Sequence, residues 1–336
     1  MDRKKMVRCS GRLLVLLCTA WISLAVADEG ANEKMWQAIL DGTHAQVMAT
    51  LENGANVNAV RKSGMTPLMW VAQDGDLELV KMLLAKGANH ALSHPSGGCT
   101  ALGFAAEHLH LEVVQALIAA GAKVEKPSMT VTPLMKVSRL DANKDQKPEE
   151  IRKKIGDMAQ LLIDNGADLS ARNDKNMTAL MMAAKAGNAN VVEKILAKAP
   201  GLVNEVDKFH NTALMLAAKS GQEKVAELLL AKGAEITRQH ECGCTALLIA
   251  AENGHLSIVK MLLDKGSDIN AKNNDGMTAL MFAASKGYMA VVQELLARNA
   301  RINELNNEGK TARTLAVESK HEDVEDLLHA SGGRCS

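Results

Sequence analysis

A threonine recurs along the chain at nearly constant intervals, and this period constrains the fold more than any other feature. The segments that it opens are alike, as residues 64–75 (GMTPLMWVAQDG) and 276–287 (GMTALMFAASKG) show. The threonines are Thr66, Thr100, Thr132, Thr178, Thr212, Thr245, Thr278 and Thr311, at steps of 34, 32, 46, 34, 33, 33 and 33 residues. A segment repeated in register at this length indicates a stacked array of similar units.

Each unit is expected to hold two short amphipathic helices. In the copy that opens at Thr278, apolar pairs follow one another at helical spacing: Ala279-Leu280, Ala283-Ala284, Val291-Val292 and Leu295-Leu296. Threonine is a good cap for the first helix. Glycine is suited to end the second helix at Gly87, Gly121, Gly166, Gly233 and Gly266. Helices this short cannot bury an apolar stripe alone, so neighbouring pairs must share one core.

With the linking segments GANVNAV, GADLSARN and GSDINAKN, the copies resemble the ankyrin repeat over about residues 32–330. The resemblance implies an all-α repeat solenoid of stacked helix-turn-helix units with short β-hairpin fingers. It also implies that the fingers and the inner face of the first helices contact a partner protein. The expected organisation is a degenerate N-terminal capping repeat (28–58), seven repeats (59–304) with an insertion at 141–153, a C-terminal capping repeat (305–330) and a flexible tail (331–336).

The chain departs from the family's Thr-Pro-Leu-His motif at the histidine. That slot holds Met69, Gly103, Met135, Met181, Met215, Leu248 and Met281. Methionine fills gaps by dispersion and burial and forms no strong hydrogen bond. We therefore interpret the row as part of the core and not as a metal or haem site.

The first 27 residues have the order of a secretory signal peptide. Five basic residues precede an apolar run from Leu13 to Val26, which closes on Ala25-Val26-Ala27. Fourteen apolar residues are too few to cross a bilayer, although an uncleaved anchor is the alternative. We predict a secreted or periplasmic chain without stable membrane insertion after cleavage, and a monomer.

Composition argues against several functional classes. Without the predicted signal peptide, 34 Lys and Arg stand against 38 Asp and Glu, so no excess positive charge favours nucleic acid or an anionic lipid surface. The sequence contains no phosphate-binding loop, HExxH helix or nucleophile elbow outside the repeats. We predict a non-catalytic protein-binding scaffold without a cofactor.

Partner contacts are sought where the copies differ. The residue before each threonine should be a finger position, and it is Met65, Cys99, Val131, Met177, Asn211, Cys244, Met277 or Lys310. A strip of soft side chains would suit a partner, but these side chains could instead pack on the next finger. At the ends of the first helices, Arg139, Lys185 and Lys219 form a basic centre that would attract an acidic segment, unless it is only a solvated face. The candidate partner-binding residues are Met65, Cys99, Arg139, Met177, Lys185, Lys219, Cys244 and Met277.

The 46-residue step contains the insertion, DANKDQKPEEIRKK. Pro148-Glu149-Glu150 is typical of a helix start, so the second helix of that unit should be longer than the others. The remaining residues predict a charged loop that projects from the array.

Three soft ligand residues lie close together at His240, Cys242 and Cys244. They favour the alternative function, a metal or redox factor that uses zinc or copper. A sharp turn before Gly243 should break the alternation that would point them to one side, and no fourth ligand is obvious beyond His255 or Cys335. A local or intermolecular disulfide and free thiols are the other possibilities.

Overall fold

The structure is a computed structural model that describes residues 29–125 and 130–335. The chain divides into two compact units, with the boundary between Lys123 and Val124. The predicted signal peptide lies outside the described residues.

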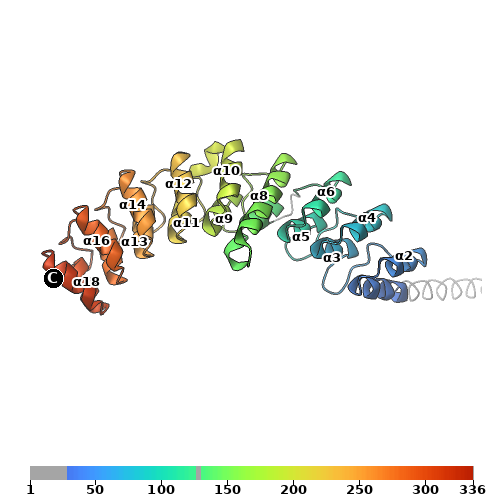
Figure 1. Cartoon of the computed structure of the whole chain (residues 1–336), viewed down its shortest axis with the longest axis horizontal. Coiled ribbons are helices and arrows are strands. Elements are labelled where there is room, and N and C mark those ends of the chain that lie inside the picture. Colours follow the sequence, from blue (N-terminus) through green and yellow to red (C-terminus); the bar gives the residue numbers. More distant parts are fainter. Residues whose placement is uncertain (1–28, 126–129, 336) are drawn as a thin grey trace, which may run out of the picture. The chain divides into compact units, whose positions relative to one another are not determined.

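The first unit consists of helix pairs. It contains a helix over residues 29–40, followed by α2 (His44–Glu52), α3 (Pro67–Asp74), α4 (Leu77–Ala85), α5 (Ala101–Glu107) and α6 (Leu111–Ala119). Helix α3 packs on α5 and α4 packs on α6, so first helices contact first helices and second helices contact second helices (Figure 1). Trp36 of the first helix packs edge to face on Trp70 of α3, with ring centroids 6.4 Å apart.

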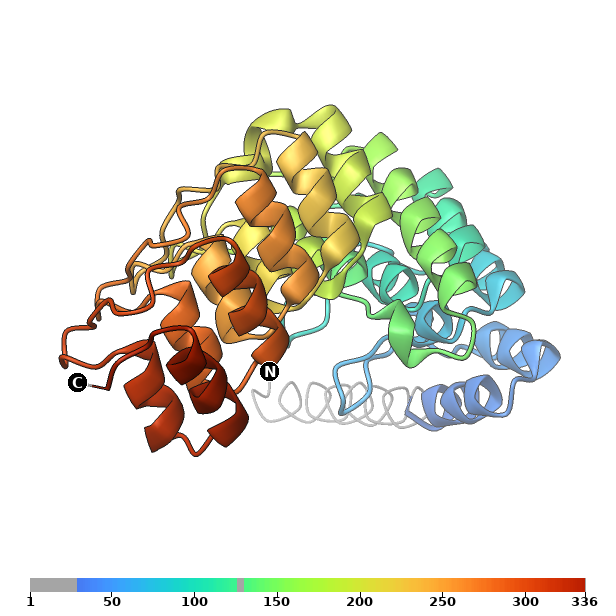
Figure 2. The ribbon, with the colours of Figure 1, turned by 60° about the vertical axis from the view of Figure 1, so that its left-hand side comes forward.

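The second unit continues the same pattern. Its first helices are α7 (Pro133–Ser138), α9 (Ala179–Ala186), α11 (Ala213–Lys219), α13 (Ala246–Glu252), α15 (Ala279–Ser285) and α17 (Ala312–Glu318). Its second helices are α8 (Pro148–Asp164), α10 (Ala189–Lys198), α12 (Glu223–Ala231), α14 (Leu256–Asp264), α16 (Met289–Ala297) and α18 (Glu322–Ala330). Two 3-10 turns, η1 (Ala142–Lys144) and η2 (Pro200–Asn204), complete the unit. Figure 2 shows α10, α12 and α14 side by side.

The recurring threonines cap the first helices, as predicted. Each threonine Oγ1 accepts the backbone N–H of the third residue after it, at 3.2–3.5 Å. The glycines predicted to end second helices adopt positive φ, for example 84° at Gly87 and 88° at Gly266. Local chemistry therefore sets both ends of the helix pair.

The methionine row lies in the core, as predicted. Met69, Met135, Met181, Met215 and Met281 are each 1% exposed. In two copies the sulfur also supports the cap, because Met215 Sδ accepts the N–H of Thr212 and Met281 Sδ that of Thr278, both at 3.5 Å. The row therefore joins the first helices of successive repeats.

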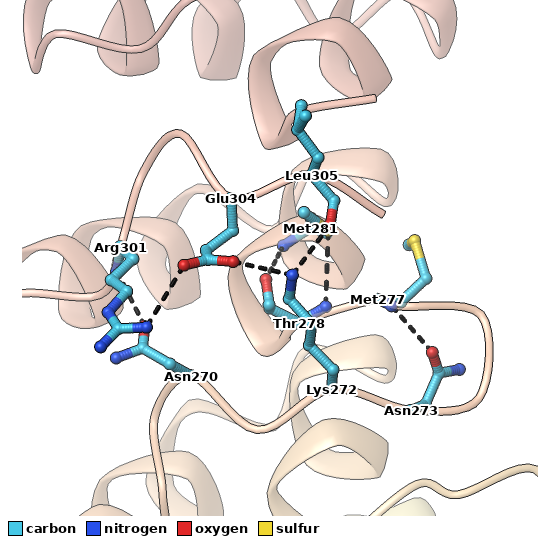
Figure 3. A network of polar contacts seen from close by, with 9 residues as sticks. All are labelled: Asn270, Lys272, Asn273, Met277, Thr278, Met281, Arg301, Glu304 and Leu305. Atoms are coloured by element: carbon cyan, nitrogen blue, oxygen red, sulfur yellow. Dashed lines mark hydrogen bonds and ion pairs between the residues drawn. The ribbon is translucent and has the colours of Figure 1, made fainter. Parts of the chain in front are cut away.

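Asparagine side chains align the loops of neighbouring repeats. In the joint drawn in Figure 3, Asn270 Oδ1 accepts the N–H of Arg301 at 2.9 Å, while Lys272 Nζ pairs with Glu304 at 2.7 Å and donates to the carbonyl of Leu305 at 2.9 Å. The same asparagine bond recurs from Asn89 N to Asn58, from Glu235 N to Asn204 and from Arg334 N to Asn303, at 2.8–2.9 Å. These exposed bonds set the register of one repeat's loop on the next.

The fingers are tight turns with little strand character. They span residues 61–65, 94–99, 173–177, 207–211, 240–244, 273–277 and 306–310, and in each the first N–H donates to the last carbonyl at 2.7–3.1 Å. Among the described residues, the β-structure consists of one isolated bridge between Ser93 and Thr100. The predicted β-hairpins are therefore shortened to turns, because a finger of five or six residues closes before a ladder can extend.

Two segments that the sequence predicts to be exposed make contacts with the array. The insertion does lengthen α8, which begins at Pro148, but its first part folds as η1 with Ala142 only 2% exposed, so it is not a free loop. The tail is not free at Gly333 and Arg334. Their carbonyls accept bonds from Arg313 Nη1 and Thr311 Oγ1, at 3.3 and 2.5 Å, and Asn303 holds the Arg334 N–H.

Candidate functional site

A groove runs between the fingers and the ends of the first helices in the second unit. The groove contains a pocket of about 610 Å³ that is open to solvent. Its finger side includes Phe209, His240 and Cys242, and its helix side includes Lys219 of α11 and Glu252 of α13. We call this pocket the finger groove. It lies where residue identity changes from copy to copy, so it is the candidate binding surface.

The predicted finger strip is wrong for three of its members, since Met65, Cys99 and Cys244 are only 7%, 7% and 3% exposed. Met177 and Met277 are half-buried. At Cys244 and Met277 the next finger covers this position. Asn273 Nδ2 donates to Cys244 Sγ at 3.6 Å, and Asn306 Nδ2 donates to Met277 Sδ at 3.5 Å. Packing between fingers therefore accounts for Cys244 and Met277, and a partner role remains a prediction for the half-buried methionines.

The basic centre is exposed. Arg139 caps the C-terminus of α7, and Lys185 and Lys219 lie in the last turns of α9 and α11, which pack on one another. Lys185 and Lys219 form no ion pair with any other described residue. A cation at a helix C-terminus interacts favourably with the helix dipole. This local interaction is sufficient to explain a basic residue at each of the three positions. Of the three, only Lys219 lines the finger groove, where Glu252 lies on the same side.

Phe209 was missed by the sequence reasoning. It is 45% exposed at a finger tip, and Lys208 Nζ lies 4.9 Å from the centroid of its ring. The sequence does single out this position, because the equivalent finger residue is polar in several other copies, such as Lys175, Asp275 and Glu308. An exposed aromatic ring beside a basic row provides an apolar contact for a partner.

The three soft ligand residues converge, contrary to the sequence prediction. Cys242 Sγ lies 3.2 Å from Cys244 Sγ and 3.4 Å from His240 Nε2. All three residues offer a ligand atom within 4.8 Å of one another. The predicted turn is present, and Gly243 has a φ of +77°. This bend brings the sulfur atoms of the two cysteines together. Burial, followed by the hydrogen bond with Cys242, raises the pKa of the Cys244 thiol to about 12.

No fourth soft ligand joins this cluster among the described residues. His255 is used elsewhere, because its Nε2 bonds the carbonyl of Lys219 at 3.2 Å. Cys335 is exposed in the C-terminal tail.

Among the described residues, no helix is both long enough and apolar enough to span a bilayer.

Comparison with known proteins agrees with the repeat geometry. A family model for ankyrin repeats (3 copies) matches residues 35–128, 151–240, 239–273 and 247–335. The ankyrin repeat and KH domain-containing protein mask of Drosophila melanogaster is 37% identical over 84 residues, which is 25% of this chain and 2% of that protein. The mouse (Mus musculus) ankyrin repeat, SAM and basic leucine zipper domain-containing protein 1 is 39% identical over 61 residues, or 18% of this chain and 13% of that protein. The matched segments thus span a small part of either relative. With stacked helix pairs, threonine caps and finger turns in successive copies, the chain belongs to the ankyrin-repeat family.

Proposed function

We propose that this chain is a non-catalytic scaffold that holds a partner protein in the finger groove. The observation that carries the proposal is the separation of two kinds of position. Side chains shared by the copies are buried between helices, whereas Phe209 and Lys219 line the groove at positions that differ between copies and stay exposed, and Lys185 is exposed at the end of the neighbouring α9. Ankyrin repeats are generally protein-interaction modules, which supports this reading.

The basic centre at the helix ends favours an acidic partner segment that reaches beyond the carboxylates Glu241, Glu252 and Asp275 of the groove lining. Lys185 and Lys219 are not neutralised by another described residue, so a carboxylate-rich segment would gain attraction without breaking an internal ion pair. The exposed ring of Phe209 would supply an apolar anchor next to it. We expect electrostatic attraction to act mainly on the association rate, which should fall as ionic strength rises.

Charge reversal with a matched control tests the proposal. The double variant Lys185→Glu/Lys219→Glu is used as bait beside Lys198→Glu/Lys232→Glu. The control pair lies at the C-terminal ends of α10 and α12, so it has the same charge change and the same relation to helix dipoles on the second helices. We expect the first variant to lose partner capture and the control to keep it. Equal capture by both variants would contradict a binding role for the basic centre.

We further propose that residues 1–27 export the chain and that it acts as a monomer. N-terminal sequencing of the protein recovered from its producing cells should give a first residue near Asp28 if the signal peptide is cleaved. Light scattering after size exclusion should give the mass of one chain. An intact N-terminus on the recovered protein would contradict export by cleavage.

A second candidate function, a metal or redox factor, is favoured by the sulfur contact between Cys242 and Cys244. It shares a surface with the scaffold, because His240 and Cys242 line the finger groove together with Lys219.

A further inference from the structure

The side chain of His240 has a structural task in its finger. In the fingers that open with Asn173, Asp207, Asn273 and Asn306, the side-chain Oδ1 accepts the backbone N–H two residues later, at 2.8–3.0 Å. His240 replaces that oxygen with Nδ1, which accepts the N–H of Cys242 at 2.9 Å. His94 does the same for Ser96 at 3.1 Å. The lone pair of Nδ1 is therefore occupied by the turn itself.

This bond determines where the imidazole proton lies. A neutral histidine has one N–H, and if Nδ1 accepts, the proton must be on Nε2. Nε2 lies 3.4 Å from Cys242 Sγ, so its N–H is directed at that sulfur. A metal ion bound at Nε2 would force the proton onto Nδ1, where it would oppose the Cys242 N–H and break the turn bond. The arrangement therefore favours sulfur chemistry over a three-ligand metal site.

The two sulfurs are arranged for intramolecular reaction. Cys242 is exposed, whereas Cys244 is 3% exposed and lies 3.2 Å away, held by Asn273. Residues two apart on a bent backbone have Cα atoms about 5 to 7 Å apart, and disulfides accept about 4.4 to 6.8 Å. The bend depends on Gly243, because a Cβ there would lie 2.3 Å from Asn274 Oδ1 and 2.9 Å from the Asn274 backbone nitrogen.

We propose that Cys242 and Cys244 form a reversible dithiol–disulfide centre whose co-reactant is a low-molecular-weight disulfide such as oxidised glutathione. The exposed Cys242 sulfur, as thiolate, attacks one sulfur of that disulfide, and the first glutathione leaves as a thiolate. Cys244 then attacks Cys242 Sγ, its thiol proton passes to the second departing glutathione thiolate, and the protein disulfide forms. Two electrons move from the protein to the small disulfide, which becomes two thiols. Cys244 is 3% exposed and lies 3.2 Å from Cys242 Sγ, so it is shielded from an external disulfide and placed for the second, intramolecular step.

The full chain offers an internal control for this reaction. Trypsin releases residues 239–260, which contain Cys242 and Cys244 as their only cysteines, and residues 87–123, which contain Cys99 alone. The reduced chain is equilibrated in glutathione buffers of increasing oxidised fraction, its thiols are trapped by alkylation, and both peptides are weighed by mass spectrometry. We expect the 239–260 peptide to pass from two alkyl groups to none, with the loss of two hydrogen atoms, in a single two-electron transition. The Cys99 peptide should show only a thiol or one bound glutathione.

Variants separate this centre from a metal site. His240→Asn keeps the turn acceptor, as Asn273 does in the next finger, but removes the Nε2–H. It should still form the disulfide, about two- to tenfold more slowly, as expected for the loss of one hydrogen bond. Cys242→Ser and Cys244→Ser should each prevent the intramolecular disulfide.

Two results would overturn the proposal, and a third would remove the promoting contact of the His240 Nε2–H with Cys242 Sγ from it. The first is two alkyl groups, or two separate glutathiones, on the 239–260 peptide at every buffer ratio. The second is one equivalent of Zn²⁺ bound by the reduced chain that blocks oxidation of the pair and is lost in His240→Asn. The third is an unchanged rate in His240→Asn, which would refute the part assigned to the Nε2–H.

Discussion

Truncating Met215 to alanine tests whether the methionine row holds the repeats together. Met215 is 1% exposed in α11, and α11 packs on both α9 and α13. The change removes three heavy atoms beyond Cβ, worth about 2 kcal/mol of transfer free energy, and leaves a cavity that neighbouring helices fill only in part. We expect the free energy of unfolding to fall by about 2 to 5 kcal/mol.

The chain itself supplies the control for this change. Leu248 occupies the same slot in the next repeat and is also 1% exposed. Met215→Leu should therefore cost less than about 1.5 kcal/mol, because it keeps the buried volume and loses only the weak bond from Thr212 N–H to the sulfur. Urea unfolding followed by circular dichroism measures both variants. In a thermal scan, each kcal/mol should lower Tm by about 2 to 4 °C for a unit of this size.

Two results would refute the reasoning about Met215. A loss below about 1 kcal/mol for Met215→Ala would mean that the slot collapses without cost or is not buried in solution. An equal loss for Met215→Leu and Met215→Ala would mean that the sulfur contact with the cap, and not buried volume, determines stability.

The remaining predictions concern pH, the insertion and the tail. Burial, opposed by a backbone hydrogen bond from Asp168, raises the pKa of Glu125 from its ordinary 4.5 to about 7. Between these two values the folded state holds a proton that the unfolded state has lost, so the free energy of unfolding should fall as pH rises from about 4.5 to about 7. Urea midpoints measured across this pH range should show the fall, and Glu125→Gln should flatten it. Deleting residues 141–153 should leave one cooperative unfolding transition, since Ala142 is its one buried residue; a broad, non-cooperative transition would place the insertion in the core. Asn303→Ala should speed amide exchange at Arg334, whose N–H it holds, and unchanged exchange would show that the tail is held by other contacts.

Much of the repeat was readable from the sequence because its determinants are local. A threonine cap bonds the third residue after it, a helix-ending glycine needs only its own positive φ, and the apolar stripe has the period of the helix. The helical extension at Pro148 was predicted for the same reason. Each of these features depends on neighbours within about one turn of the chain.

The binding surface could not be read in the same way, because it depends on residues about one repeat away. The exposure of Cys244 is decided by Asn273 in the next finger, and the tail is held by Asn303. The convergence of Cys242 with Cys244 depends on the backbone turn at Gly243, a turn that was predicted from the sequence but expected to separate the three ligand residues. The sequence alone determined the repeat, its caps and its buried rows. Tertiary structure decided which variable side chains reach solvent, because only the stacking of one copy on the next covers some finger residues and leaves others open.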